Sequence, residues 1–107
     1  MRDETKLCEF LERLWAEEVC DPPVNETWRE MIARIRGGGN QRVSRETYRY
    51  FLEVLPPHYH GGDYFAFCEG AEALKLFARR GGTFIARQLT WQETVTFCDL
   101  AGIDLPD

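Results

Sequence analysis

The chain has 107 residues, of which 44% are hydrophobic and 13% aromatic, and its formal net charge at pH 7 is −5. This length fits one domain, and the composition is that of a folded chain, not a disordered one. No apolar run reaches the roughly 18 residues that a membrane-spanning helix needs. The charged residues 1–5 lack the apolar stretch of a signal peptide. We therefore expect a single cytoplasmic domain over residues 1–107, with no membrane partner.

Three helices are predicted in the N-terminal half from apolar side chains that recur at helical spacing. The first is expected over about residues 4–19, before a pair of prolines that cannot continue it. The second begins after Thr27, which has capping-box spacing to Glu30. It ends at residues 37–40, Gly-Gly-Gly-Asn, which we expect to form a flexible hinge. The third begins after Ser44, a favourable N-cap residue.

The C-terminal half contains an approximate repeat. Residues 61–66, Gly-Gly-Asp-Tyr-Phe-Ala, are similar to residues 81–86, Gly-Gly-Thr-Phe-Ile-Ala. Each copy is predicted to form a short aromatic strand followed by a helix, the helices lying over about residues 71–80 and 90–102. Two parallel strands alone make an unusual sheet. Either the strands are antiparallel, or a partner chain adds a strand, as in a homodimer.

The predicted fold class is therefore α+β and mostly α. Three N-terminal helices in residues 1–57 are followed by two short strand–helix units in residues 58–107. Trp28 is expected in the core, and Trp91 is expected to be partly exposed. The periodic apolar positions are predicted to be buried together: Leu11, Leu14, Met31, Ile32, Ile35, Phe51, Leu52, Phe65, Phe77 and Phe97.

Residues with catalytic or metal-binding chemistry are few. The four cysteines form no Cys-x-x-Cys pair and are expected to be reduced thiols. His58 and His60 offer two metal ligands, without companions at helical or zinc-knuckle spacing. Cys68 could pair with either histidine as a nucleophile, but a buried strand cysteine is the simpler interpretation. We expect no catalytic residue, no bound metal and no cofactor.

Positive charge is concentrated in one segment. Residues 27–49 contain six arginines and two glutamates, within an acidic chain. Arginine suits recognition of carboxylate and phosphate groups. We predict a recognition surface that contains Arg36, Arg42, Arg45 and Arg49. Trp91 is predicted to be a further exposed anchor. The alternative is that these arginines pair with the acidic side chains of the first helix, Glu9, Glu12, Glu17 and Glu18.

One stretch resembles a known family. The run Tyr-Arg-Tyr-Phe-Leu-Glu-Val-Leu-Pro-Pro at residues 48–57, with Gly62, Tyr64, Phe65 and Ala66 downstream, is similar to a group of small alphaproteobacterial and plasmid-borne proteins. That family is known only as a domain of unknown function. The resemblance covers residues 45–66 and implies a mobile-element setting, without any site residue.

Three functions follow as hypotheses. The first is a non-enzymatic protein-binding module: a phage- or plasmid-borne inhibitor or regulator of a host system, of the anti-CRISPR or another anti-defence type, with a host protein or complex as partner. The second is a nucleic-acid-binding protein that uses the arginine cluster. The third is a small metal- or Cys/His-dependent hydrolase that uses His58, His60 and a cysteine or carboxylate.

Overall fold

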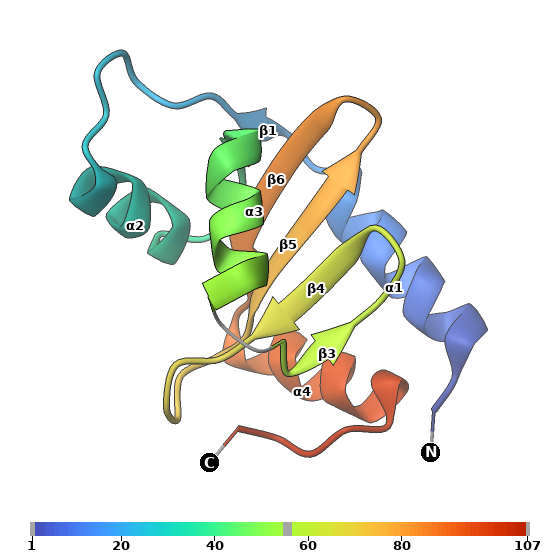
Figure 1. Cartoon of the computed structure of the whole chain (residues 1–107). Helices are drawn as coiled ribbons and strands as arrows, with labels where there is room; N and C mark the ends of the chain where they lie inside the picture. The colour runs from blue at the N-terminus through green and yellow to red at the C-terminus, as the bar shows by residue number, and fades with distance from the viewer. Residues whose placement is uncertain (1, 55–56, 107) are drawn as a thin grey trace.

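The computed structural model describes residues 2–54 and 57–106, which form a six-stranded mixed sheet with two helices on each face (Figure 1). The strand order is β1-β2-β6-β5-β4-β3, and β1–β2 is the parallel pair. Helices α1 and α4 cover one face, and α2 and α3 cover the other. The elements in chain order are α1 (Glu4–Trp15), β1 (Val19–Cys20), α2 (Trp28–Arg36), β2 (Asn40–Val43), α3 (Arg45–Val54), β3 (Tyr59–His60), β4 (Tyr64–Phe67), β5 (Lys75–Arg80), β6 (Thr83–Gln88) and α4 (Trp91–Ala101).

The helix starts follow local capping signals. Thr27 and Glu30 form a capping box at the start of α2, and Thr90 and Glu93 form another at the start of α4. The Ser44 hydroxyl accepts a hydrogen bond from the backbone N–H of Thr47 at the start of α3. The sequence therefore predicts these three helix starts correctly. Helix α1 is shorter than predicted, because the chain after Trp15 turns into β1.

The predicted fold class is wrong, because helices and strands alternate along the chain instead of segregating. Residues 71–80, predicted as a helix, contain β5, which pairs with β4 and β6. Residues 74–78 of this segment are all buried. A strand covered on both faces carries a continuous apolar run, which periodicity alone cannot distinguish from a buried helix. Residues 58–106 therefore contain a β-meander followed by one helix, not two strand–helix units.

The two similar segments occupy equivalent places on either side of β5. Strands β4 and β6 both run antiparallel to β5, so that Phe65 and Ala86 each lie opposite Phe77. Strands β4 and β6 are therefore parallel to each other, so the predicted antiparallel arrangement is wrong, and β5 of the same chain lies between them.

The predicted glycine hinge is a turn that leads directly into β2. Gly38 and Gly39 have φ of 89° and 73°, a region that favours glycine. Asn40 is buried, and its side-chain amide donates hydrogen bonds to the carbonyl oxygens of Leu14 at 2.8 Å and Glu17 at 3.2 Å. These bonds tie the start of β2 to the end of α1.

The predicted core residues are mostly buried, but the sheet divides them into two clusters. Leu11, Leu14 and Phe97 pack between the sheet and α1/α4. The other face holds the second cluster, in which Ile32 and Leu52 are only partly buried, and which includes Met31, Ile35, Phe51, Phe65 and Phe77. Trp28, predicted in the core, is half exposed, whereas the predicted exposure of Trp91 is confirmed.

None of the helices in the described ranges has both the length and the apolar character needed to span a bilayer. All four cysteines are free thiols. Cys8 and Cys20 are exposed, Cys68 is partly buried, and Cys98 is buried.

The turn between β3 and β4 makes a close approach that only glycine permits. A Cβ atom on Gly61 would overlap the Tyr64 ring, which is packed against Trp15 and Tyr59. We expect Gly61→Ala to lower the free energy of unfolding by about 1–3 kcal/mol, as overpacking does. Gly62→Ala is the matched control, because a Cβ there meets nothing within 4 Å. Urea denaturation of both variants checks this, and equal stabilities would contradict it.

Candidate binding site: an arginine-lined groove

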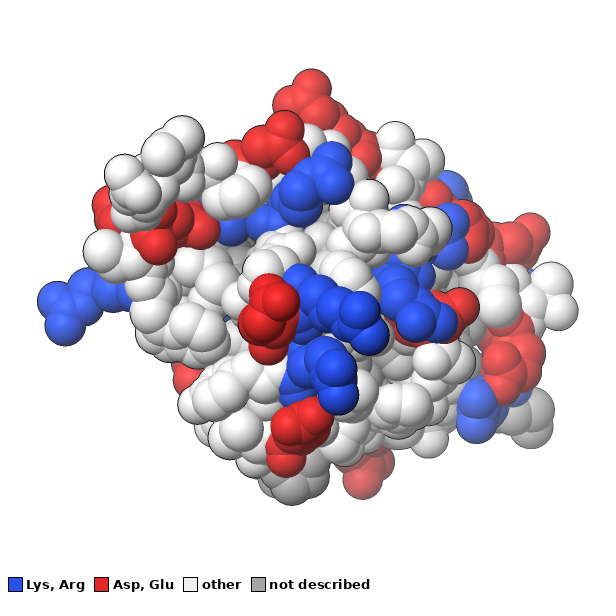
Figure 2. All heavy atoms as spheres, turned by 45° about the horizontal axis from the view of Figure 1, so that its top comes forward, with Lys and Arg blue, Asp and Glu red and all other residues white. Residues whose placement is uncertain are grey.

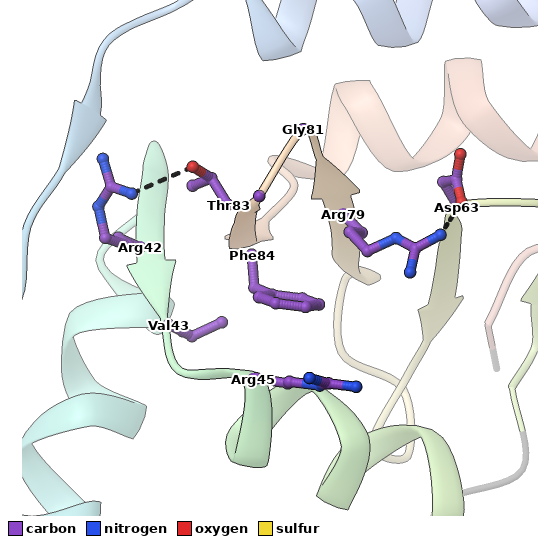
Figure 3. A pocket seen from close by; sticks show the side chains of 9 residues that line it. Arg42, Val43, Arg45, Asp63, Arg79, Gly81, Thr83 and Phe84 are labelled. Carbon is purple, nitrogen blue, oxygen red and sulfur yellow. Dashed lines mark hydrogen bonds and ion pairs between the residues drawn. The ribbon is translucent and has the colours of Figure 1, made fainter.

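A groove of about 820 Å³ opens at the end of the sheet where the β5–β6 hairpin and the start of α3 meet (Figure 3). We call it the arginine groove. Three segments distant in sequence line it: the end of β2 with the start of α3, the turn before β4, and the β5–β6 hairpin. Its lining residues are Arg42, Val43, Arg45, Asp63, Arg79, Gly81, Gly82, Thr83 and Phe84.

Two arginines lie on either side of an aromatic ring in this groove. The Phe84 ring extends into the space between Arg45 of α3 and Arg79 of β5 (Figure 3). The Arg79 guanidinium makes an ion pair with Asp63 at 3.0 Å, and both side chains are largely exposed. For Arg45, the described residues include no carboxylate within ion-pair distance. The groove therefore offers one engaged and one unengaged guanidinium beside an apolar surface.

Arg42 stands at the rim of the groove. Its Nε lies 2.6 Å from Asp21 Oδ1, and its Nη1 donates a hydrogen bond to Thr83 Oγ1 at 3.2 Å. Because this guanidinium already has an acidic and a hydroxyl partner, it is less free than Arg45 to bind a ligand. Arg42 fixes the edge strand β2 against the β5–β6 hairpin.

A smaller hollow of about 340 Å³ continues the groove along α3. It shares Arg45, Asp63, Arg79 and Phe84 with the arginine groove and adds Arg49 and His60, among other residues. Arg49 lies 4.0 Å from Glu53, one helical turn away, in an exposed pair of small energetic value.

Tyr48 lies along the same hollow. Burial raises the pKa of the Tyr48 phenol, and the charge of Arg79 opposes that shift. The phenol is therefore neutral at physiological pH and can donate a hydrogen bond.

The position of Arg45 in its helix favours an anionic ligand. Arg45 is the first residue of α3, where the helix dipole disfavours a cation and favours an anion. Figure 2 shows basic side chains gathered at the middle of this face, with acidic side chains beside and around them.

The structure brings together three of the five predicted binding residues: Arg42, Arg45 and Arg49. Arg36 lies elsewhere, on the far end of α2, where it contacts Glu69 at 3.7 Å. Trp91 begins α4, on the opposite face of the sheet. Arg36 and Trp91 therefore line neither the arginine groove nor the hollow beside it.

The alternative, in which these arginines pair with the acidic residues of the first helix, is also wrong for Arg36, Arg42 and Arg49. The predicted arginines contact acids from three other parts of the chain, Asp21, Glu53 and Glu69. Helix α1 and the residues after it pair instead with strand arginines, Glu12 with Arg80 and Glu17 with Arg87.

Sequence analysis missed Arg79 and Phe84. Arg79 falls within the predicted helix over residues 71–80, where the structure has the strand β5. The signal that was present is Gly81-Gly82 between two apolar runs, which is typical of a two-residue hairpin. Gly81 has φ of 62°, and Arg80 pairs directly with Thr83 across this turn.

The residues proposed for hydrolytic or metal chemistry do not form a cluster in the part of the chain that the structure describes. No group of three His, Cys, Asp or Glu side chains there could hold a metal ion. The His58 ring lies 3.2 Å from the carbonyl oxygen of Asp104, whereas His60 lines the hollow beside the arginine groove. Burial raises the pKa of the Cys98 thiol, which favours its less nucleophilic protonated form.

The geometry of the arginine groove therefore suits binding of an anionic group next to an apolar one. Comparison of the chain with protein-family models, with curated proteins and with solved structures finds no match.

Proposed function

We propose that this protein is a non-enzymatic binding module that holds an acidic segment of a partner protein in the arginine groove. The observation that carries the proposal is the placement of Arg45 and Arg79, from α3 and β5, on either side of Phe84. Arginine binds carboxylates through paired N–H donors, and an adjacent aromatic ring accommodates apolar side chains. A peptide segment that carries both acidic and apolar residues satisfies both parts of the groove.

Two acidic side chains favour a protein ligand over a nucleic acid. Asp63 lines the groove, and Asp21 lies against Arg42 at its rim. A continuous phosphate backbone would meet these carboxylates, and the chain as a whole is acidic. A peptide can place single carboxylates at the two arginines and avoid the aspartates. The partner we propose is a host protein or complex, which a phage- or plasmid-borne protein would inhibit or regulate by occupying its acidic segment.

The test is selection of peptides followed by binding measurements on variants. Random 12-residue peptides displayed on phage are selected against the immobilised protein, and enriched peptides are synthesised with a fluorescent label. We expect acidic residues next to apolar ones in these peptides. Arg45→Ala should weaken binding about 10-fold and Arg45→Ala/Arg79→Ala about 100-fold, since each charge-assisted hydrogen bond contributes about 1.5–3 kcal/mol.

Arg13→Ala is the matched control, because Arg13 is exposed on α1, on the other face of the sheet. Its affinity for the peptides should equal that of the unaltered protein. Single- and double-stranded oligonucleotides are measured in parallel. Oligonucleotide binding that is tighter than peptide binding, and is lost in the double variant, would replace this proposal with nucleic-acid recognition. Unchanged peptide binding in the double variant would contradict it.

A further inference from the structure

Exposed apolar side chains gather in a cleft between α2 and α3, away from the arginine groove. Trp28, Tyr50 and Val54 are each about half exposed, although side chains of this kind are normally buried. The cleft encloses about 290 Å³ and has no lining residue in common with the arginine groove. We call it the α2–α3 cleft, and its lining residues are Trp28, Ile32, Arg36, Tyr50, Phe51, Val54 and Glu69.

The aromatic side chains of the cleft are held in place by the core. The Trp28 ring stacks on Phe51 at a centroid distance of 5.5 Å and meets Tyr50 edge-on at 5.2 Å. Phe51 is itself buried and stacks on Phe67 of the sheet. Trp28 and Tyr50 would therefore lose little side-chain entropy when a partner covered them. Exposed tryptophan and tyrosine of this kind are the residues most often responsible for binding energy at protein interfaces.

Arg36, at one end of the cleft, shares its acidic partner Glu69 with Lys75, which is buried and does not line the cleft. Glu69 lies between two cations, 3.7 Å from the Arg36 guanidinium and 3.5 Å from Lys75 Nζ. Lys75 is only 3% exposed, and its Nζ has no hydrogen-bond partner among the described residues. A buried ammonium without such a partner is energetically costly. A second carboxylate at this end would be favoured.

The surface beside the cleft continues along α2 and also combines apolar with basic side chains. A shallow hollow of about 630 Å³ shares Trp28, Ile32 and Arg36 with the cleft and continues to Arg29 and Gly37. Residues 28–37 span about 13 Å of helix at 1.5 Å per residue. This length matches two to three turns of a second helix, and basic residues lie at both ends of the apolar strip.

We propose that the α2–α3 cleft is a second docking site, which binds an amphipathic acidic helix of a partner protein. Apolar side chains one turn apart enter the cleft at Trp28 and Tyr50, as in other helix-in-groove complexes. An acidic side chain of the same helix then lies at Arg36, where it competes with Glu69. This site is independent of the arginine groove, so that either site can bind without the other.

The experiment uses a display library of 16-residue helical peptides, selected against the Arg45→Ala/Arg79→Ala protein so that the arginine groove cannot select them. We expect enriched peptides with apolar residues at i and i+4 and acidic residues beyond them. Their affinity should fall at least 30-fold in Trp28→Ala/Tyr50→Ala and remain unchanged in Trp91→Ala. Trp91 has the same 50% exposure as Trp28 but lies on α4. Circular dichroism confirms that each variant is folded, and Val54→Glu is a second way to block the cleft.

Glu69→Ala provides the sharper test. Removal of the competing carboxylate should tighten binding of a selected acidic peptide about 3- to 10-fold and leave binding of its Gln-substituted analogue unchanged. Equal effects on both peptides, or helical peptides that still bind Trp28→Ala/Tyr50→Ala, would overturn the proposal. Analytical ultracentrifugation of the protein alone tests whether a second copy of this chain, instead of a partner helix, occupies the cleft. A dimer that Trp28→Ala/Tyr50→Ala dissociates would mean that a second copy of this chain covers the cleft.

Discussion

Replacement of Phe77 by alanine is expected to lower the free energy of unfolding by about 3–5 kcal/mol, the usual cost of removing a fully buried phenylalanine. Phe77 lies on the central strand β5 and is inaccessible to solvent. Its ring centroid lies 4.9 Å from that of Phe51 on α3, 5.2 Å from Phe65 and 5.5 Å from Phe67 on β4. The loss therefore leaves a cavity where α3 packs against the sheet. Urea denaturation followed by tryptophan fluorescence measures the change.

Val24→Ala serves as the control for Phe77→Ala, because Val24 is 90% exposed and its replacement should change the free energy of unfolding by less than about 0.5 kcal/mol.

The milder substitutions Phe77→Leu and Phe97→Leu test the division of the core into two clusters. Phe97 belongs to the cluster on the other face of the sheet. The two effects should therefore add to within about 0.5 kcal/mol. A loss below about 1 kcal/mol in Phe77→Ala would contradict the packing of α3 on β5.

Replacement of Arg87 by methionine is expected to lower the free energy of unfolding by about 2–4 kcal/mol. Arg87 of β6 is buried, and it joins β6 to β2, to α4 and to the segment that follows α1. Its guanidinium donates hydrogen bonds to Glu17 at 2.8 Å, Glu93 at 3.0 Å and the Asn40 side-chain oxygen at 3.4 Å. Removal of one partner of a buried ion pair costs about 3–5 kcal/mol. The expected loss is somewhat smaller because Glu17 is half exposed. Thermal and urea denaturation measure it.

A second substitution separates the ionic effect from the loss of packing. Glu93→Gln keeps a side-chain oxygen for the backbone N–H of Thr90, which Glu93 binds in the capping box of α4. It removes the unpaired charge that Arg87→Met leaves behind. Arg87→Met/Glu93→Gln should therefore be more stable than Arg87→Met, by about 1 kcal/mol. Arg13→Met, at an exposed position, should have almost no effect. Near-normal stability of Arg87→Met would show that this network does not hold the three elements together.

Only part of the arginine groove and of the hollow beside it could be predicted from the sequence. Arg45 and Arg49 share a predicted helix, and their four-residue spacing places them on one face of it whatever the rest of the chain does. Arg79 comes from β5, and only the pairing of the sheet brings it beside Phe84 and near Arg45. Arg36 is close to Arg42 in sequence, but the turn at residues 37–39 separates the end of α2 from the hairpin.

Local signals in the sequence predict the starts of the four helices in residues 2–54 and 57–106, but similar signals also predict a helix over residues 71–80, where the structure has β5. Apolar faces and side-chain caps such as Thr27 and Thr90 act within a few residues of the helix they start. The sheet, in contrast, depends on contacts between segments that are distant in the sequence. Apart from Lys75, residues 74–78 are apolar enough for a buried helix, and they form a central strand because β4 and β6 supply hydrogen-bond partners on both sides. Strand pairing joins residues distant in the chain, so its register cannot be read from any one segment. The same long-range pairing divides the core into two layers and brings Arg79 to the groove.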